Sequence, residues 1–315
     1  MKNIIGKITK FEQFPLIIVL IIVVGGLTVI QPNYFSVQNF IIILFSASIV
    51  GLVTIGQSYL IIAGQIDLSP GAVAAFSGVL SAVLLQKGLP TIVVMVMVIG
   101  VSALIGYINS VFVNLLKMDS FIVTVAAMSI FTGLSYIIGG GMSVAIMDES
   151  FIYFGAGKIF GIPNSILIFA IIFVIFLIIL TRTRFGRSVY MIGGNEKAAR
   201  LAGINPKKVK MVLFMLAPVM ASIGGMIVAG RMNSGQPSPQ NYLMFGSITA
   251  AVVGGIKFGG GKGSLLGALT GVILLEAFNN GIAVLNISSF WQSVASGLLL
   301  IVALTVDYIR TTRSK

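Results

Sequence analysis

The chain has 315 residues, of which 57% are hydrophobic and only 9% are charged, and its formal net charge is +12. A soluble domain usually carries about 25% charged residues, so this composition excludes an ordinary water-soluble protein. Cysteine and histidine are both absent, which excludes disulfides, thiol nucleophiles, zinc sites of the usual kind and histidine proton relays. The charges lie between apolar runs rather than in a cluster with stacking aromatics, which argues against nucleic-acid binding.

Apolar runs of about 20 residues, the length that crosses a bilayer, recur along the chain. They predict an all-α integral membrane protein with about ten transmembrane helices, one broken or re-entrant element, and a single domain over residues 1–315. The eighth run is short for a full crossing, and the first lacks a cleavage site and is predicted to be retained. In chain order the predicted spans are 14–30, 39–62, 70–86, 90–114, 121–139, 165–181, 210–230, 244–257, 264–285 and 289–307.

Positive charge predicts the orientation. With the N-terminus in the cytoplasm, all but three of the 20 lysines and arginines fall on the inner side, the exceptions being Lys87, Lys158 and Arg231. Loops rich in lysine and arginine remain on the cytoplasmic side of a membrane. Both ends of the chain are basic, so both termini are predicted to be cytoplasmic, and an even number of crossings satisfies this.

The longest inner segment, about 182–209, contains signals for a short helix. Asn195 can cap its start, Glu196 suits its positive end, and Gly203 suits the position just beyond its C-terminus. They predict about two turns, residues 196–202, which need a surface to dock on. Two interpretations stay open from the residues alone: a basic loop lying on anionic lipid, or a helix that docks a cytoplasmic partner. The caps at both ends favour docking slightly.

The same segment resembles the loop by which permeases of ATP-binding-cassette (ABC) transporters engage their ATPase subunits, through the pattern Glu196-x-Ala198-Ala199-x-x-x-Gly203. The resemblance implies an ATPase-coupling loop made by Gly194, Asn195, Glu196, Ala198, Ala199 and Gly203. From about residue 50 to 307 the chain is similar to the ribose-type sugar permease family. The motifs that carry this similarity, in order, are 64–71 (GQIDLSPG), 236–237 (QP), 250–255 (AAVVGG), 259–263 (GGGKG) and 279–281 (NNG).

This resemblance implies the permease subunit of an ABC importer for a monosaccharide or a similar small polar solute, in the plasma (inner) membrane of a bacterium. It implies three partners: a cytoplasmic ATPase subunit, an extracytoplasmic solute-binding protein, and a second permease copy that is identical or related. Hydrolysis of ATP would belong to the ATPase subunit, so no enzyme activity and no cofactor are expected of this chain. Met244 and Gly246 stand where the family commonly has acids, which leaves pentose, hexose, furanose and nucleoside-like solutes open.

Several polar residues within apolar runs are candidates for the solute route: Gln65, Asp67, Glu276, Asn279 and Asn280. The segment 64–71 is either a well-formed turn, with Ser69 as a helix cap and Pro70 at the first helical position, or a broken element that lines the route. Glu276 and the asparagines share a helix face. They bind sugar hydroxyls or a partner helix, or they hold two helices of the chain together.

The alternative function is an ion-coupled secondary transporter of a small solute, which would need intramembrane carboxylates with partners. Glu276 is the only acid clearly at depth in the membrane, so support for this alternative is thin.

Glycines spaced by four residues at 255, 259, 263, 267 and 271 predict close helix packing. Gly261 and Lys262 resemble the end of a phosphate-binding loop, but Ile256 and Gly263 break that pattern and exclude it. Residues 233–241 are predicted to form an external polar loop, either solvated or in contact with the delivering protein.

Overall fold

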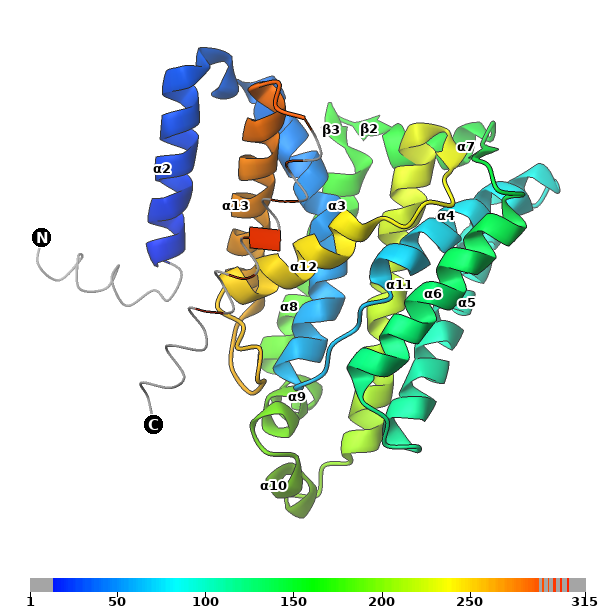
Figure 1. Ribbon diagram of the computed structural model, residues 1–315, viewed down its shortest axis with the longest axis vertical. Helices are drawn as coiled ribbons and strands as arrows, with labels where there is room; N and C mark the ends of the chain where they lie inside the picture. The colour runs from blue at the N-terminus through cyan, green and yellow to red at the C-terminus, as the bar shows by residue number, and fades with distance from the viewer. Residues whose placement is uncertain are drawn as a thin grey trace, which may run out of the picture.

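The computed structural model describes residues 14–288 and, beyond them, only residues 291, 294, 297, 298, 301 and 305. Apart from those six, the predicted tenth span and both ends of the chain lie outside the described residues. Every other predicted span forms a helix (Figure 1). The helices are α2 (Phe14–Ile30), η1 (Pro32–Tyr34), α3 (Val37–Ile62), α4 (Pro70–Gln86), α5 (Thr91–Asn114), α6 (Ser120–Ile138), α7 (Glu149–Ala156), α8 (Asn164–Arg182), α9 (Arg184–Gly194), α10 (Glu196–Leu201), α11 (Pro206–Met232), α12 (Asn241–Val253) and α13 (Leu265–Val284).

Among the described residues, the strands are two residues long and form two antiparallel pairs. Strand β1 (Val144–Ala145) pairs with β4 (Ser234–Gly235), and β2 (Lys158–Ile159) pairs with β3 (Ile162–Pro163). They lie at the end of the bundle where α7 sits, opposite the end where α10 projects (Figure 1). Neither these strands nor α7 and α9 were predicted, because elements of two to eleven residues are too short to give an apolar run of spanning length.

Six of the described helices are long and apolar enough to cross a membrane: α3, α5, α6, α8, α11 and α13. Helices α2, α4 and α12 are apolar but shorter. Large apolar side chains such as Ile22, Ile92 and Ile137 are exposed on the outside of the bundle, as a lipid-facing surface requires. The prediction of an all-α membrane protein is therefore confirmed, while ten full crossings and cytoplasmic termini stay predictions.

Two elements are broken inside the bundle. In the first, α3 ends at Ile62, the chain turns at Gly64, residues 65–68 run as an extended segment back along the bundle, and α4 begins about halfway up (Figure 1). In the second, α11 ends at the α7 end and the chain turns back into the bundle, where α12 begins. The order of long helix, extended segment and short helix is the same in both, and the two run in opposite directions. Such inverted pairs of discontinuous helices are a recurrent architecture of transporters.

The two broken elements meet where their short helices begin. The backbone N–H of Gln240 donates a hydrogen bond of 3.1 Å to the carbonyl oxygen of Gly71. A Cβ atom on Gly71 would lie 2.7 Å from the Gln240 carbonyl oxygen, so only glycine permits this contact. Gly235 and Pro237 are also buried. The prediction that residues 233–241 form an external polar loop is therefore only partly correct: Asn233, Gln236 and Ser238 are exposed, but the segment also enters the bundle and pairs with the first broken element.

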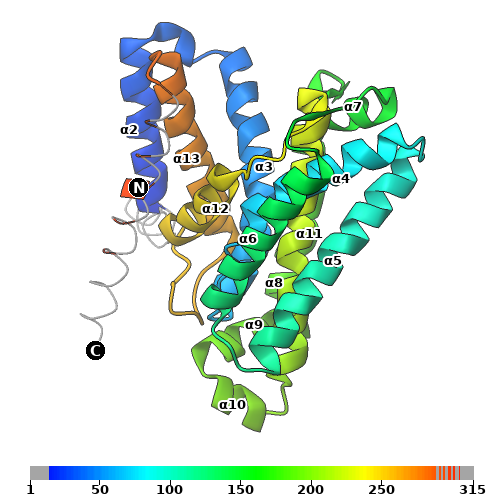
Figure 2. The ribbon, with the colours of Figure 1, turned by 45° about the vertical axis from the view of Figure 1, so that its right-hand side comes forward.

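Helix α11 runs through the middle of the bundle and contacts α3, α4 and α5 (Figure 2). Small residues let these backbones approach closely. Of the five glycines that were predicted to pack helices closely, two do so. Gly267 and Gly271 of α13 do pack against the backbone of α12, where a Cβ on either would overlap a carbonyl oxygen. The earlier members of the series belong instead to the turn that joins α12 to α13.

A matched pair of glycines on α5 tests the close packing. A Cβ on Gly106 would overlap the Phe214 carbonyl oxygen and lie 2.6 Å from the Met215 Cα, whereas one on Gly100 meets nothing within 4 Å. We expect Gly106→Ala to destabilise the fold by about 1–3 kcal/mol, the usual cost of overpacking. Gly100→Ala should be neutral or slightly stabilising, since alanine favours helix. Thermal unfolding in detergent measures both, and equal midpoints would contradict the close approach of α5 and α11.

Candidate functional site

Helix α10 is a short helix closed at both ends, as its sequence predicts. The Asn195 side chain accepts a 3.0 Å hydrogen bond from the Ala198 N–H. At the other end Gly203 has a φ of +83° and donates to the Arg200 carbonyl at 3.0 Å. The N–H of Ile204 completes this glycine-based C-cap by donating to the Ala199 carbonyl at 3.1 Å. The helix ends at Leu201, one residue earlier than predicted.

Glu196 ties α10 to the bundle. Its carboxylate accepts a hydrogen bond of 2.7 Å from Lys210 of α11 and one of 3.4 Å from Arg200. The hydrogen bond from Lys210, together with the charges of Lys210 and Arg200, holds the pKa of Glu196 below its ordinary value. Glu196 therefore orients α10 within this chain, and any contact with a partner would add to that role.

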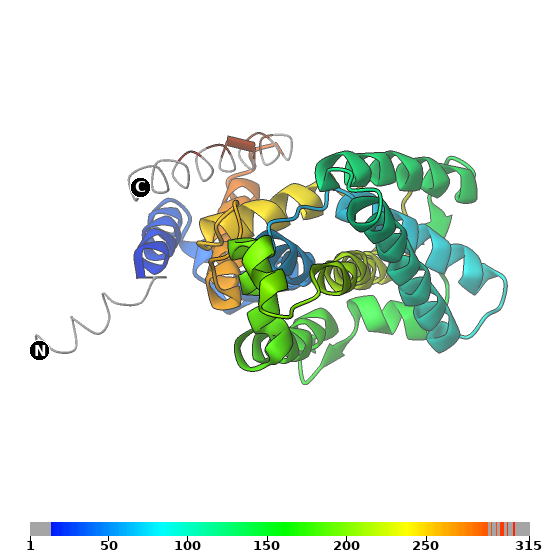
Figure 3. The same cartoon turned by 90° about the horizontal axis from the view of Figure 1, so that it is seen from below.

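One face of α10 is apolar and exposed. The Leu201 side chain is 90% exposed, and Ala198 and Ala202 beside it are also exposed. These three residues are spaced by three and four positions and so share one helix face. Ala199, which is 1% exposed, anchors the opposite face. Figure 3 views the molecule from the end where α10 projects. The sequence reasoning named Ala198 but missed Leu201, which one further step of three residues would have found.

Helix α9 carries the chain from α8 to α10. Thr183 caps it by accepting a 3.2 Å hydrogen bond from the Gly186 N–H. Val189 and Ile192 are buried against the bundle. Tyr190 donates its hydroxyl hydrogen to the Gly263 carbonyl at 2.8 Å. Since α9 packs on α3 and α8 and leads into α10, α10 is attached to the helix bundle through α9 as well as through the Glu196–Lys210 ion pair.

Asp67 lies fully buried in the extended segment before α4. Its Oδ1 accepts hydrogen bonds from the Ser69 backbone N–H at 2.7 Å and from the Ser69 hydroxyl at 2.6 Å. The Gln57 amide donates to the Asp67 backbone carbonyl. Pro70 begins α4 and Ser69 occupies its N-cap position, as predicted, but the Ser69 side chain makes no cap hydrogen bond and donates to Asp67 instead. The Asp67 carboxylate thus satisfies the backbone at the break.

Two oxygens at this break, Asp67 Oδ2 and Gln57 Oε1, have no hydrogen-bond partner among the residues that the structure describes. Both side chains are 0% exposed. Gln65 is separate from them, since it lies at the surface and its amide donates to the Gly64 carbonyl at 2.9 Å. The segment 64–71 is therefore a broken element, and of its two predicted route residues only Asp67 lies inside the bundle.

Glu276 lies in a second polar group, nearer the α7 end. It is 8% exposed and accepts a 3.4 Å hydrogen bond from Asn279. In the part of the chain that the structure describes, every ion pair involves Glu196, so Glu276 has no cation within ion-pair distance there. Asn280, four positions after Glu276, has a buried side-chain oxygen without a described partner. No described hydrogen bond joins this group to Asp67.

Residues that the sequence reasoning did not select complete this second group. The Tyr242 side chain, at the start of α12, is 55% exposed and lies close enough to Glu276 and Arg231 to interact electrostatically with both. The Arg231 guanidinium stacks over the Phe45 ring at 4.0 Å from its centroid. Two aromatic rings, an arginine and a carboxylate, each from a different helix, lie in this region. No local sequence pattern could reveal that convergence.

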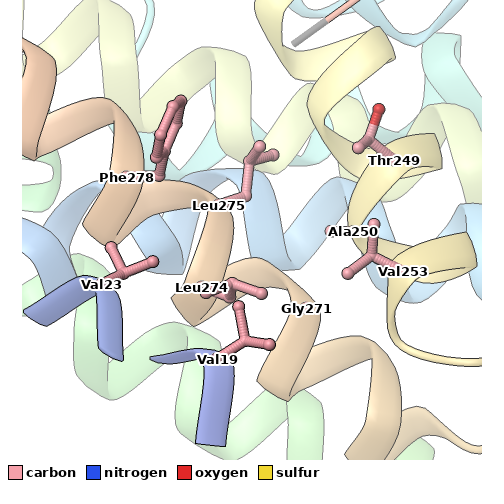
Figure 4. A pocket seen from close by; sticks show the side chains of 9 residues that line it. All are labelled: Val19, Val23, Thr249, Ala250, Val253, Gly271, Leu274, Leu275 and Phe278. Carbon is pink, nitrogen blue, oxygen red and sulfur yellow. The ribbon is translucent and has the colours of Figure 1, made fainter. Parts of the chain in front are cut away.

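An apolar crevice of about 180 Å³ lies between α2, α12 and α13 (Figure 4). Val19 and Val23 of α2 and Leu274 and Phe278 of α13 line it, and Thr249 supplies the one oxygen among the side chains drawn. A polyhydroxylated solute would leave most of its hydroxyls without partners there, which is unfavourable. This crevice therefore does not form part of a sugar route.

Asp67 provides a test of the break before α4. Asp67→Ala leaves the buried Ser69 N–H without an acceptor, which costs about 1–3 kcal/mol. Asp67→Asn keeps an oxygen in the place of Oδ1 and should lose clearly less. We expect the thermal unfolding midpoint in detergent to fall in the order wild type, Asp67→Asn, Asp67→Ala. Equal losses for the two variants would show that the carboxylate does not hold the break through Oδ1.

The opposed broken elements that meet inside the bundle, with a capped helix projecting from one end, are the architecture of a multi-pass membrane permease. The chain belongs to the family described as the permease component of branched-chain amino acid transport systems, whose model matches residues 39–304. It is 35% identical over 301 residues to the ribose import permease of Haemophilus influenzae, covering 94% of this chain and 93% of that protein.

Two further relatives extend the comparison. The ribose import permease of Bacillus subtilis is 33% identical over 304 residues, with 96% of this chain and 94% of that protein covered. The L-arabinose transport system permease of Escherichia coli is 35% identical over 303 residues, with 94% and 90% covered. No solved structure matches the chain. The resemblance to the sugar permeases is confirmed by these matches.

Proposed function

We propose that the chain is the membrane permease subunit of an ATP-driven importer that moves a monosaccharide into a bacterial cell. The observation that carries this proposal is α10, which is capped at both ends, tied to α11 through Glu196 and turns an exposed Leu201 away from the chain. An exposed apolar face on an ordered helix favours a protein contact. The coupling loop is assigned to Gly194, Asn195, Glu196, Ala198, Ala199 and Gly203, with Leu201 added from the structure.

The distribution of basic residues supports a cytoplasmic location for the α10 end. The residues at that end are Lys117, Arg182, Arg184, Arg187, Lys197, Arg200, Lys207, Lys208, Lys210, Lys257 and Lys262, against Lys87, Lys158 and Arg231 at the α7 end. A membrane protein keeps its positively charged loops inside. In the proposed assembly a cytoplasmic ATPase binds α10, a second permease copy lies alongside in the bacterial plasma membrane, and a solute-binding protein delivers cargo at the α7 end.

The names of the relatives support a pentose as cargo, since three proteins similar to nearly the whole chain are named for ribose or L-arabinose. The second polar group has suitable chemistry for such a solute. Carboxylate, amide and guanidinium groups bond to hydroxyls, and aromatic rings pack on the apolar faces of a sugar. We therefore assign Glu276, Asn279 and Asn280 to the route, with Tyr242 and Arg231 beside them. Asp67 and Gln65 belong to the broken element further along it.

The proposed mechanism couples ATPase binding at the α10 end to solute binding in the route towards the α7 end. Closure of the ATPase around ATP favours one position of α10, and cargo favours one state of the route. Each ligand shifts the equilibrium between outward-facing and inward-facing forms only by its difference in affinity for them. Ion-coupled secondary transport has less support, because Asp67 and Glu276 have no described charged partner and the relatives named above are import permeases.

Leu201 tests the docking surface. Because its side chain is 90% exposed, Leu201→Ala should leave the fold intact. If Leu201 fills a pocket of the ATPase, its truncation should weaken the complex about tenfold or more, as at other interface hot spots. The measurement is the amount of ATPase that co-purifies with the tagged chain, together with uptake of radiolabelled D-ribose and L-arabinose by cells. Leu266→Ala, on a 47% exposed leucine of α13, is the control. Unchanged co-purification would remove α10 from the interface.

Tyr242 and Glu276 test the route. We expect Tyr242→Ala to lower the maximal uptake of the radiolabelled pentose several-fold, because an aromatic contact is worth about 0.5–1.5 kcal/mol. Glu276→Gln should also reduce uptake, since the amide is a weaker acceptor for hydroxyls than a carboxylate. Tyr107→Ala, on a 44% exposed tyrosine of α5, is the matched control. Uptake that is unchanged in both variants would reduce this group to a packing role.

A further inference from the structure

Three segments that are distant in the sequence meet as bare backbone at the α10 end of the bundle. They are residues 62–64 at the end of α3, 193–194 at the end of α9, and 260–261 in the turn between α12 and α13. The Gly261 N–H donates a 2.8 Å hydrogen bond to the Ile62 carbonyl. We call this set the glycine junction.

No side chain fits at Gly193, Gly260 or Gly261 of the glycine junction. A Cβ on Gly260 would lie 2.9 Å from the Gly193 carbonyl oxygen and 2.9 Å from the Gly64 nitrogen. A Cβ on Gly261 would lie 2.8 Å from the Gly194 Cα, and one on Gly193 would overlap the Ile62 carbonyl oxygen. In addition, Gly64, Gly260 and Gly261 have φ values of +70°, +83° and +77°, which other residues rarely adopt. The contact is therefore made by backbone atoms alone.

Each segment of the glycine junction leads directly into an element with a role in transport. Residues 193–194 immediately precede α10. Residues 62–64 begin the extended segment of the first broken element, and residues 260–261 follow α12 of the second. Further into the bundle the same two broken elements are joined again by the hydrogen bond between Gln240 and Gly71. The contacts thus form a closed ring: from the glycine junction along residues 64–71, across to Gln240, down α12, and back to the glycine junction.

We propose that the glycine junction is the positioning contact that transmits a displacement of α10 to both broken elements together, so that they move as one unit. This rests on the proposed function, in which α10 receives its displacement from an ATPase. Side chains can change rotamer and absorb a small shift, whereas backbone atoms in van der Waals contact transmit it, because packed interiors have few voids and low compressibility. The glycines therefore position α10 relative to the route without touching the cargo.

Two glycines provide the test. Gly193→Ala places a methyl group against Ile62, whereas a methyl on Gly100 of α5, outside the glycine junction, meets nothing within 4 Å, so Gly100→Ala is the control. The complex of the full chain with its co-purifying ATPase is reconstituted in liposomes with radiolabelled D-ribose or L-arabinose. The readout is the amount of sugar moved per ATP hydrolysed. We expect this ratio to fall at least fivefold for Gly193→Ala and to stay at the wild-type value for Gly100→Ala.

A merely structural role would reduce the amount of assembled complex but leave the ratio per complex unchanged, and that result would overturn the proposal. If the wild-type complex moves no sugar, the proposed function itself is contradicted, and the experiment then does not single out the role of the glycine junction.

If Gly193→Ala does not assemble, a second measurement is made on a chain in which the glycines are intact. The chain has no cysteine, so spin labels can be placed at Lys197→Cys on α10 with either Lys262→Cys in the α12–α13 turn or Leu116→Cys after α5.

The distances between these labels are measured by pulsed electron resonance with and without ATP. We expect the distance from position 197 to position 262 to remain constant within about 2 Å, well below the several-ångström shifts of conformational switches. The distance from position 197 to position 116 should change by more. A change between 197 and 262 as large as that between 197 and 116 would overturn the proposal, because α10 and the turn would then move independently.

Discussion

The constraint on which this structure depends is the absence of water inside a bilayer, where every backbone N–H and C=O must find a partner within the protein. Unbroken helices meet this constraint by themselves. The two broken elements meet it by bonding to each other and to buried side chains: Gln240 donates to Gly71, and the Asp67 carboxylate accepts from Ser69. Since each break is satisfied partly by the other, they are stable only as a pair, and the bundle around α11 is arranged to hold them together.

Much of the fold could be predicted from the sequence, because hydropathy directly measures the lateral surface that lipid and neighbouring helices cover. The helix bounds agree to within a few residues along residues 14–288, and α10 was predicted from Asn195 and Gly203 because capping is local. What failed depends on contacts distant in sequence. Residues 233–241 are polar enough for a loop, yet they lie in the bundle because Gly71 leaves room for them. The Ser69 side chain donates to the Asp67 carboxylate instead of making a cap hydrogen bond, and this choice likewise depends on the three-dimensional geometry.

The candidate sites show the same division. The predicted coupling residues lie within ten positions of one another and were predicted together. By contrast, Tyr242 approaches Glu276 and Arg231, and Arg231 approaches Phe45, only in the folded chain. The division also separates two kinds of chemistry. At the α10 end the chain offers an apolar face with basic residues around it, which suits a protein surface. Towards the α7 end it offers hydrogen-bonding groups and rings, which suit a small polar solute.

The ring of contacts between the glycine junction and the Gly71–Gln240 hydrogen bond has a mechanical consequence. Two segments that are in contact at both ends have fewer independent motions than two segments in contact at one end only. The ring therefore suppresses states in which one half of the bundle opens while the other stays in place. Water and ions would leak through such half-open states. The ring of contacts therefore helps to keep the membrane impermeable to them during transport of a sugar.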